Sequence, residues 1–152
     1  MRKSPRVSQY LISGALIGAL FLWLALALLV GINPDLSWVP NNFGLFFAVC
    51  FLSPVLEEYV FRGLVYDYVE RRSQWVWPAN SVLKISISNL VSSFLFVMLH
   101  GILRGSSAAL LVIVPSLYLG MLRRETSGLG PCILVHGFWN LGWFSLFPPM
   151  TS

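Results

Sequence analysis

Charged residues are scarce in this sequence, and their scarcity excludes several classes of protein. Only 11% of the 152 residues are Asp, Glu, Lys or Arg, whereas 57% are hydrophobic, and the mean hydropathy is +0.75. These values lie outside the range of soluble globular domains. The net charge of +4 comes from basic residues in the short gaps between apolar runs, without a basic stripe that carries interleaved aromatic residues. The composition therefore predicts a polytopic membrane protein and argues against nucleic-acid binding.

Cysteine is also rare, which argues against a disulfide-stabilised scaffold. Cys50 and Cys132 both lie inside apolar segments, where a cysteine usually packs as a small hydrophobic residue. The sequence shows no internal repeat, no low-complexity tract and no soluble domain. We therefore expect residues 1–152 to form a single membrane-embedded domain.

The apolar runs predict an all-α, polytopic transmembrane helix bundle of about five spans. Crossing a hydrocarbon core about 30 Å thick takes about 20 apolar residues in a helix. The expected spans are 10–32, 43–72, 82–103, 106–122 and 129–147. The first run follows a basic N-terminus, as in a signal peptide, but it is longer than the roughly 7–15 apolar residues of a signal peptide, so we expect an uncleaved span.

Basic residues orient the predicted bundle, because they concentrate on the cytoplasmic side of membrane proteins. Only Arg104 falls on the opposite side of a five-span arrangement, and Arg62 lies within a helix. The basic residues on the first side are Arg2, Lys3, Arg6, Arg71, Arg72, Lys84, Arg123 and Arg124. This distribution predicts a cytoplasmic N-terminus in a lipid bilayer, and the compact chain favours a bacterial or archaeal plasma membrane.

Residues 54–63 place three charges, those of Glu57, Glu58 and Arg62, inside an otherwise apolar run. A charge at membrane depth costs between about 2.5 and 17 kcal/mol, so it must face protein or a water-filled cavity. Glu58 and Arg62 are four residues apart and can pair on one helix face. Glu57 points about 100° away and is available to another partner, and Pro54 predicts a kink just before the acids. The stretch is either a buried structural ion pair or part of an active site.

The other polar groups at membrane depth lie on two further predicted helices. His136 and Asn140 are four residues apart and share a face, as do Phe96 and His100. Each polar group would otherwise face lipid, so we expect them to share one pocket with the two glutamates. A desolvated glutamate can act as a general base toward water, with a histidine that orients the water. A second histidine and an amide are donors suited to a developing oxyanion, so this set suits amide hydrolysis by activated water.

A zinc hydrolase is an alternative, because two histidines and a glutamate form a known catalytic ligand set. The sequence has no His-Glu-x-x-His helix, and Asn140 suits hydrogen bonding better than zinc ligation. We therefore expect no metal or other cofactor. Another alternative is a non-catalytic membrane protein, such as a bacteriocin-immunity protein, that uses the same pocket to bind a peptide.

Three motifs in order resemble those of the CAAX protease and bacteriocin-processing family, also called the CPBP or Abi family of intramembrane glutamic proteases. The motifs are Glu57-Glu58-x-x-x-Arg62, Phe96-x-x-x-His100 and His136-x-x-x-Asn140. The resemblance covers about residues 43–140. It implies a metal-independent intramembrane endopeptidase that cuts near the C-terminus of a membrane-associated protein or peptide, for example at a C-terminal sorting signal.

The resemblance also implies roles for seven residues. Glu57 would activate water together with His100, and His136 with Asn140 would form the oxyanion hole. The supporting residues would be Glu58, Arg62 and Phe96, the last of which would pack behind His100. Many members of the family have more spans than this chain, so a homo-oligomer or a partner membrane protein that completes the enclosure of the substrate remains open.

The predicted span limits create one conflict with a shared pocket. Straight helices over these spans would place Glu57 and His100 at depths that differ by about 10–15 Å, at about 1.5 Å of rise per residue. The two side chains can meet only if the second or third helix is displaced or if the helix limits differ from those expected.

Overall fold

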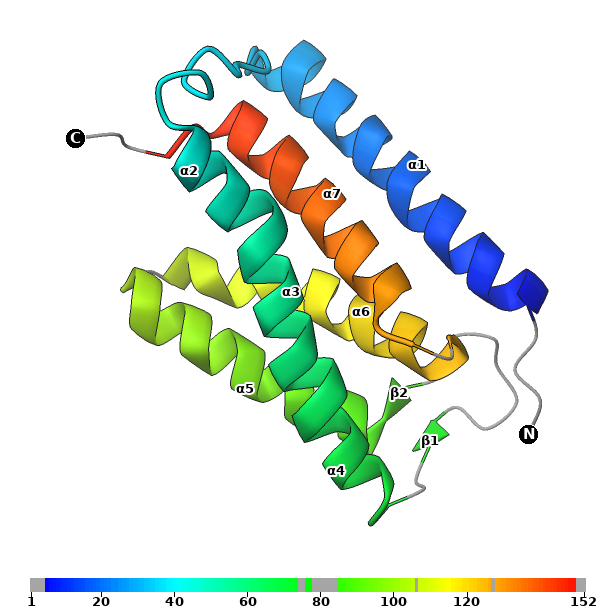
Figure 1. The fold of residues 1–152 in the computed structure, drawn as a ribbon. Helices are drawn as coiled ribbons and strands as arrows, with labels where there is room; N and C mark the ends of the chain where they lie inside the picture. The colour runs from blue at the N-terminus through cyan, green and yellow to red at the C-terminus, as the bar shows by residue number, and fades with distance from the viewer. Residues whose placement is uncertain (1–4, 74–75, 78–84, 106, 127, 150–152) are drawn as a thin grey trace.

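The computed structural model describes residues 5–73, 76–77, 85–105, 107–126 and 128–149, which form a bundle of helices (Figure 1). The elements in chain order are α1 (Pro5–Val30), α2 (Phe43–Phe47), η1 (Ala48–Leu52), α3 (Ser53–Glu58), η2 (Tyr59–Val65), α4 (Tyr66–Glu70), β1 (Val76–Trp77), β2 (Ile85–Ser86), α5 (Ile87–Arg104), η3 (Ser107–Val112), α6 (Ile113–Glu125) and α7 (Gly130–Leu146). The two strands have two residues each. The predicted all-α fold is confirmed.

Residues 43–70 form one continuous helix that changes its hydrogen-bonding pattern along its length. Segments η1 and η2 are π-helical, and they lie on either side of α3, which carries both glutamates. In a π-helix each N–H group bonds the carbonyl five residues back instead of four. Pro54, in the first turn of α3, has no N–H group to donate. The predicted disturbance at Pro54 therefore takes the form of a π-helical turn just before it.

Helix α5 begins at Ile87, later than the predicted residue 82. This difference determines how far along the helix axis His100 lies. Ile85 and Ser86 pair with β1 in a small antiparallel sheet, with Val76 opposite Ser86 and Trp77 opposite Ile85. The Ser86 side chain then caps the helix by accepting a hydrogen bond from the backbone N–H of Asn89. The helix ends at Gly105, whose φ of 59° is a left-handed conformation that glycine adopts without strain.

The predicted fourth span is divided into a 3₁₀ helix, η3, and the α-helix α6. Pro115 lies in the first turn of α6, where a backbone N–H has no carbonyl partner within the helix. The break in this span therefore comes before the proline instead of at it.

Helices α5 and α6 lie against each other through a polar contact. The Asn89 side chain donates to the carbonyl of Leu117 at 2.9 Å. Gly120 makes room for this side chain, because a Cβ atom at that position would lie 1.8 Å from Asn89 Oδ1. A cluster of buried residues joins α1, α6 and α7, and its members are Leu11, Ala15, Leu119, Leu122, Cys132 and Val135.

Helix α1 lies alongside α7 (Figure 1). Trp139 Nε1 donates to the carbonyl of Ala15 at 3.3 Å. On the same interface Gly142 receives the indole of Trp23, because a Cβ atom there would lie 1.8 Å from the ring. Helix α1 is therefore a packed element of this fold.

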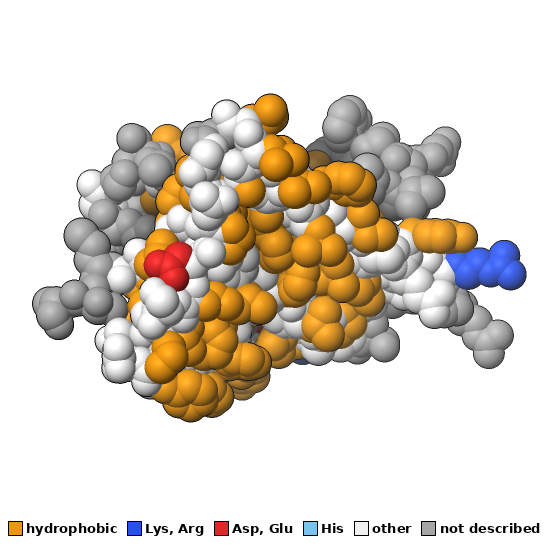
Figure 2. All heavy atoms as spheres, turned by 90° about the horizontal axis from the view of Figure 1, so that it is seen from above, with side chains coloured by type: hydrophobic (Ala, Val, Ile, Leu, Met, Phe, Trp, Pro, Cys, Tyr) orange, Lys and Arg blue, Asp and Glu red, His pale blue; other side chains and the backbone are white. Residues whose placement is uncertain are grey.

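Two helices are long and apolar enough to cross a membrane, by length and composition alone: Arg6–Leu29 and Phe43–Glu70. Only 11% and 17% of their most apolar windows are buried, unlike the core helices of soluble proteins. Hydrophobic side chains spread over the face seen in Figure 2, where few charged side chains are visible. Helix α5 is apolar but shorter. The count of about five spans stays a prediction.

Candidate active site

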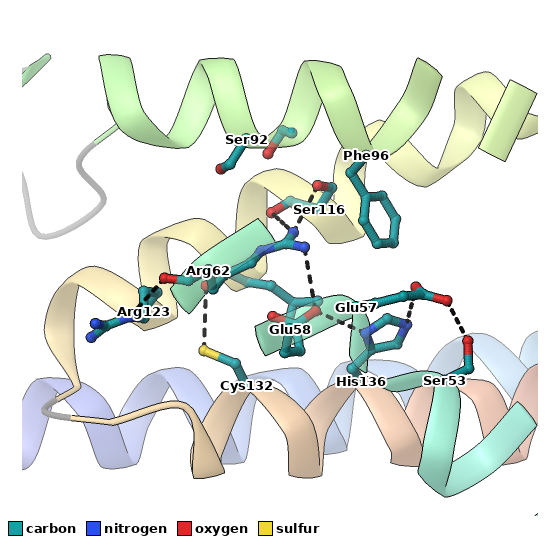
Figure 3. A network of polar contacts seen from close by, with 12 residues as sticks. Ser53, Glu57, Glu58, Arg62, Ser92, Phe96, Ser116, Arg123, Cys132 and His136 are labelled. Atoms are coloured by element: carbon teal, nitrogen blue, oxygen red, sulfur yellow. Dashed lines mark hydrogen bonds and ion pairs between the residues drawn. The ribbon is translucent and has the colours of Figure 1, made fainter. Parts of the chain in front are cut away.

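Residues from the 43–70 helix, α5, α6 and α7 meet in the interior of the bundle (Figure 3). His100 Nε2 lies 3.9 Å from Glu57 Oε2, so these two side chains meet as expected. The expected start of the third helix at residue 82 is wrong, because α5 begins at Ile87. The start of α5 adjoins the end of α4, where Ser88 donates a hydrogen bond to Glu70. Glu57 lies about 13 residues before the end of α4, and His100 lies about 13 residues after the start of α5, which is about 20 Å along each of two antiparallel helices. Because α5 starts late, the two residues lie at the same distance from the contact between α4 and α5.

The two oxygens of Glu57 have different surroundings. Ser53, one turn earlier in the same helix, donates a hydrogen bond to Oε1. Oε2 makes no direct hydrogen bond to the described residues, but it faces Nε2 of His100 at 3.9 Å and Nε2 of His136 at 3.7 Å. These separations are too long for direct hydrogen bonds. With 20% of its side chain exposed, Glu57 is the more accessible glutamate.

The second nitrogen of each histidine fixes the tautomer of its ring. His100 Nδ1 lies 3.0 Å from the carbonyl oxygen of Phe96, which only accepts, so Nδ1 carries a proton. His136 Nδ1 lies 2.8 Å from Glu58 Oε1, so this nitrogen also donates. Both rings therefore present Nε2 to the same oxygen of Glu57.

The predicted ion pair between Glu58 and Arg62 is present, and both side chains are completely buried. Arg62 Nη1 lies 3.3 Å from Glu58 Oε1, the oxygen that also accepts from His136. Arg62 Nη2 donates to the carbonyl and the hydroxyl oxygen of Ser116, at 2.9 and 2.7 Å. The pair thus links three helices, α7 through His136, α6 through Ser116 and the 43–70 helix itself.

Phe96 forms an aromatic wall of the site. Its ring centroid lies 4.2 Å from that of His100 and 5.9 Å from that of His136. The guanidinium carbon of Arg62 lies 4.9 Å from the same centroid, within the range of a cation–π contact. Phe96 therefore contacts His100 as expected and also contacts Arg62.

The seventh predicted residue, Asn140, has a different partner. Its Nδ2 donates to the backbone carbonyl of Val49, in η1, at 2.8 Å. The structure thus brings together six of the seven residues, and it directs the amide of Asn140 to the helix that carries the glutamates. The catalytic roles of all seven stay predictions.

Sequence reasoning missed two contacts of the site. Ser53 lies four residues before Glu57, so helical spacing alone could have identified it. Ser116 binds Arg62 from a helix far along the chain, and no local sequence pattern indicates that contact.

Within the described residues, no three side chains of His, Cys, Asp or Glu are arranged to hold a metal ion. The two histidines and Glu57 converge, with separations of 3.7 and 3.9 Å between nitrogen and oxygen. The expectation that no metal takes part stays a prediction.

A comparison with protein families places this geometry in context. Residues 39–142, more than half of the chain, match the family described as type II CAAX prenyl endopeptidase Rce1-like. The matched segment contains all seven predicted site residues. Searches of curated proteins and of solved structures found no match. The expected resemblance to CAAX proteases is confirmed, and the apolar helices agree with a membrane protein. The chain belongs to the type II CAAX prenyl endopeptidase Rce1-like family, a family of membrane proteases.

Proposed function

We propose that this protein is an intramembrane endopeptidase that uses a water molecule activated by Glu57. Its substrate is a membrane-anchored protein or peptide, cut near the C-terminus, and a C-terminal sorting signal is one substrate of this kind. No metal takes part in the proposed reaction. The observation that carries the proposal is the convergence of both imidazole Nε2 atoms on Glu57 Oε2, at 3.7 and 3.9 Å.

Water activation follows from this convergence. A water molecule between Glu57 Oε2 and His100 Nε2 hydrogen-bonds to both, so its position and orientation are fixed. Glu57 takes a proton as the water oxygen attacks the carbonyl carbon of the scissile peptide bond. The same proton then passes to the leaving nitrogen as the carbon–nitrogen bond breaks. Ser53 holds Oε1 and leaves Oε2 for the reaction.

The developing oxyanion needs donors on the side away from the attacking water. In this proposal His136 serves this role through Nε2–H, while its Nδ1–H is bonded to Glu58 Oε1. One N–H of the Asn140 amide donates to Val49, and the other can serve the same oxyanion. Arg62 keeps Glu58 in place and balances its charge.

We also propose a multi-pass topology with a cytoplasmic N-terminus in a prokaryotic plasma membrane. In support, α1 begins at the end of the bundle where α4 and α6 finish (Figure 1). The described basic residues at this end are Arg6, Arg71, Arg72, Arg123 and Arg124. The proposed orientation rests on their concentration there; the corresponding predictions for Arg2, Lys3 and Lys84 lie outside the described residues. Labelling of single cysteines introduced at residues 37 and 72 by a membrane-impermeant maleimide tests it, and preferential labelling at residue 72 in intact cells would contradict it.

The decisive variant is Glu57→Gln, which keeps the size of the side chain and removes the base. We expect cleavage of membrane-anchored reporter peptides to fall by at least about 10³-fold while the protein remains folded and inserted. The panel should contain a prenylated CAAX peptide and an unprenylated peptide with a C-terminal membrane anchor. Glu125→Gln, at the end of α6, is the matched control and should retain parental activity.

Full activity of Glu57→Gln would remove this residue from the mechanism. Loss of activity on chelation, with recovery on addition of zinc, would instead indicate a zinc hydrolase. If the parent cleaves no peptide, yet parent and Glu57→Gln bind one equally and protect cells equally from a bacteriocin, the protein is a non-catalytic immunity or peptide-binding protein.

A further inference from the structure

The backbone just before the glutamates contains a carbonyl that the helix cannot satisfy in the usual way. In an α-helix the Val49 carbonyl would accept from the N–H of Ser53, four residues on, and in a π-helix from residue 54. The N–H of Ser53 instead bonds the carbonyl of Ala48. Residue 54 is proline and has no N–H group. Neither backbone donor is therefore available to Val49.

Helix α7 supplies the missing donor. Asn140 Nδ2 donates to the Val49 carbonyl at 2.8 Å. At the neighbouring carbonyl, that of Cys50, α7 comes close because residue 137 is glycine, and a Cβ atom there would lie 2.8 Å from the Cys50 oxygen. The consecutive carbonyls of Val49 and Cys50 thus both face α7. The Val49 carbonyl accepts a hydrogen bond from Asn140, and the Cys50 carbonyl lies against Gly137.

The consequence reaches Glu57 through the geometry of the helix. A π-helical turn adds one residue to the turn, which rotates the segment that follows by about 100° relative to a continuous α-helix. The direction in which the side chains of α3 point therefore depends on whether η1 stays π-helical. Glu57 Oε2 meets the two imidazoles only in the observed rotation.

We propose that Asn140 is a positioning residue, whose amide caps the Val49 carbonyl left without a backbone donor by Pro54 and so fixes the rotation of α3. This role goes beyond the oxyanion contact of the proposed function and does not require it. It acts in the resting protein, before any substrate binds.

A double-mutant cycle on thermal stability tests the proposal. Asn140→Ala leaves the Val49 carbonyl without a donor, and the expected fall in Tm is about 4–8 °C. Pro54→Ala restores an N–H group at residue 54, so a backbone donor becomes available to Val49. In that background Asn140→Ala should lower Tm by less than half as much.

The matched control uses another side-chain-to-backbone bond of α7. Trp139→Phe removes the bond to Ala15, and its effect on Tm should be the same with proline or alanine at residue 54. An Asn140→Ala effect of equal size in both backgrounds, or no effect in the parent, would overturn the proposal. Since the readout is stability, its failure is distinct from loss of the proposed peptidase function, which Glu57→Gln tests by activity.

Hydrogen exchange provides a second measurement in case Pro54→Ala fails to fold. In Asn140→Ala the amides of residues 48–58 should exchange at least about tenfold faster, while those of residues 87–104 should not change. Unchanged exchange in residues 48–58 would overturn the proposal without the proline variant.

Discussion

Replacement of Arg62 by methionine tests whether the buried ion pair is essential to the fold. Arg62 and Glu58 are both completely buried, and their charged atoms lie 3.3 Å apart. Methionine keeps much of the length of the side chain and removes the charge. Removing one partner of such a pair leaves the other charge buried, which typically costs about 3–5 kcal/mol.

The contacts around Arg62 set the expected size of the effect. The variant also removes the two hydrogen bonds to Ser116, and one unsatisfied buried carbonyl costs about 1–3 kcal/mol. Glu58 keeps one partner, His136 Nδ1 at 2.8 Å, which offsets part of the loss. We therefore expect Arg62→Met to lower the free energy of unfolding by about 4 kcal/mol and Tm by roughly 10 °C.

A second substitution separates the charge effect from lost packing. Glu58→Gln combined with Arg62→Met removes both charges, so no unpaired charge remains buried. This double variant should recover at least about 2 kcal/mol relative to the sum of the two single variants. Arg72→Met is the surface control, because Arg72 is exposed and lies over the Tyr68 ring, and it should shift stability by less than about 1 kcal/mol.

Unfolding in detergent micelles, followed by tryptophan fluorescence against temperature and denaturant, provides the measurement. Stability of Arg62→Met within about 1 kcal/mol of the parent would refute the argument. Strict additivity of the two single variants would also refute it, because the pair would then carry no mutual stabilisation.

Two further predictions concern a contact of Glu57 and a helix interface. Ser53→Ala should lower kcat about tenfold with little change in KM, since it removes a hydrogen bond to the Glu57 carboxylate; Ser53→Thr should restore the rate, and equal rates in the parent and the alanine variant would rule out this role. Gly120→Ala should lower the free energy of unfolding by about 1–3 kcal/mol, because its Cβ would overlap the Asn89 amide. The double variant Gly120→Ala with Asn89→Ala should be more stable than Gly120→Ala alone. An unchanged melting curve of Gly120→Ala would contradict this packing.

The fold class and the convergence of the site followed from the cost of charge in lipid, and this argument needed no homologue. Glu58 and Arg62 could be paired from their spacing, and Phe96 could be placed beside His100 for the same reason. These are contacts within one helix, where a fixed rise and rotation determine which side chains meet. Such contacts can be read directly from a sequence.

The contacts that were missed depend on the backbone between helices. Helix α5 starts only after Ile85 and Ser86, which pair with β1, whereas the span expected from the sequence runs through both residues. The π-helical segment η1 contains the Val49 and Cys50 carbonyls that α7 contacts. Since that contact joins residues about 90 positions apart, no local window of sequence contains the information.

The docking of α1 bears on how members of this family can differ from one another. The segment that matches the family begins at residue 39, so α1 lies outside it. The indole of Trp23 in α1 nevertheless occupies the notch that Gly142 leaves in α7, the helix that carries His136. In a chain trimmed to residues 39–152 the tails of neighbouring lipids would enter that notch in place of the indole. Helix α1 therefore shields the surface of α7 around Gly142 from lipid, although it lies outside the segment that matches the family.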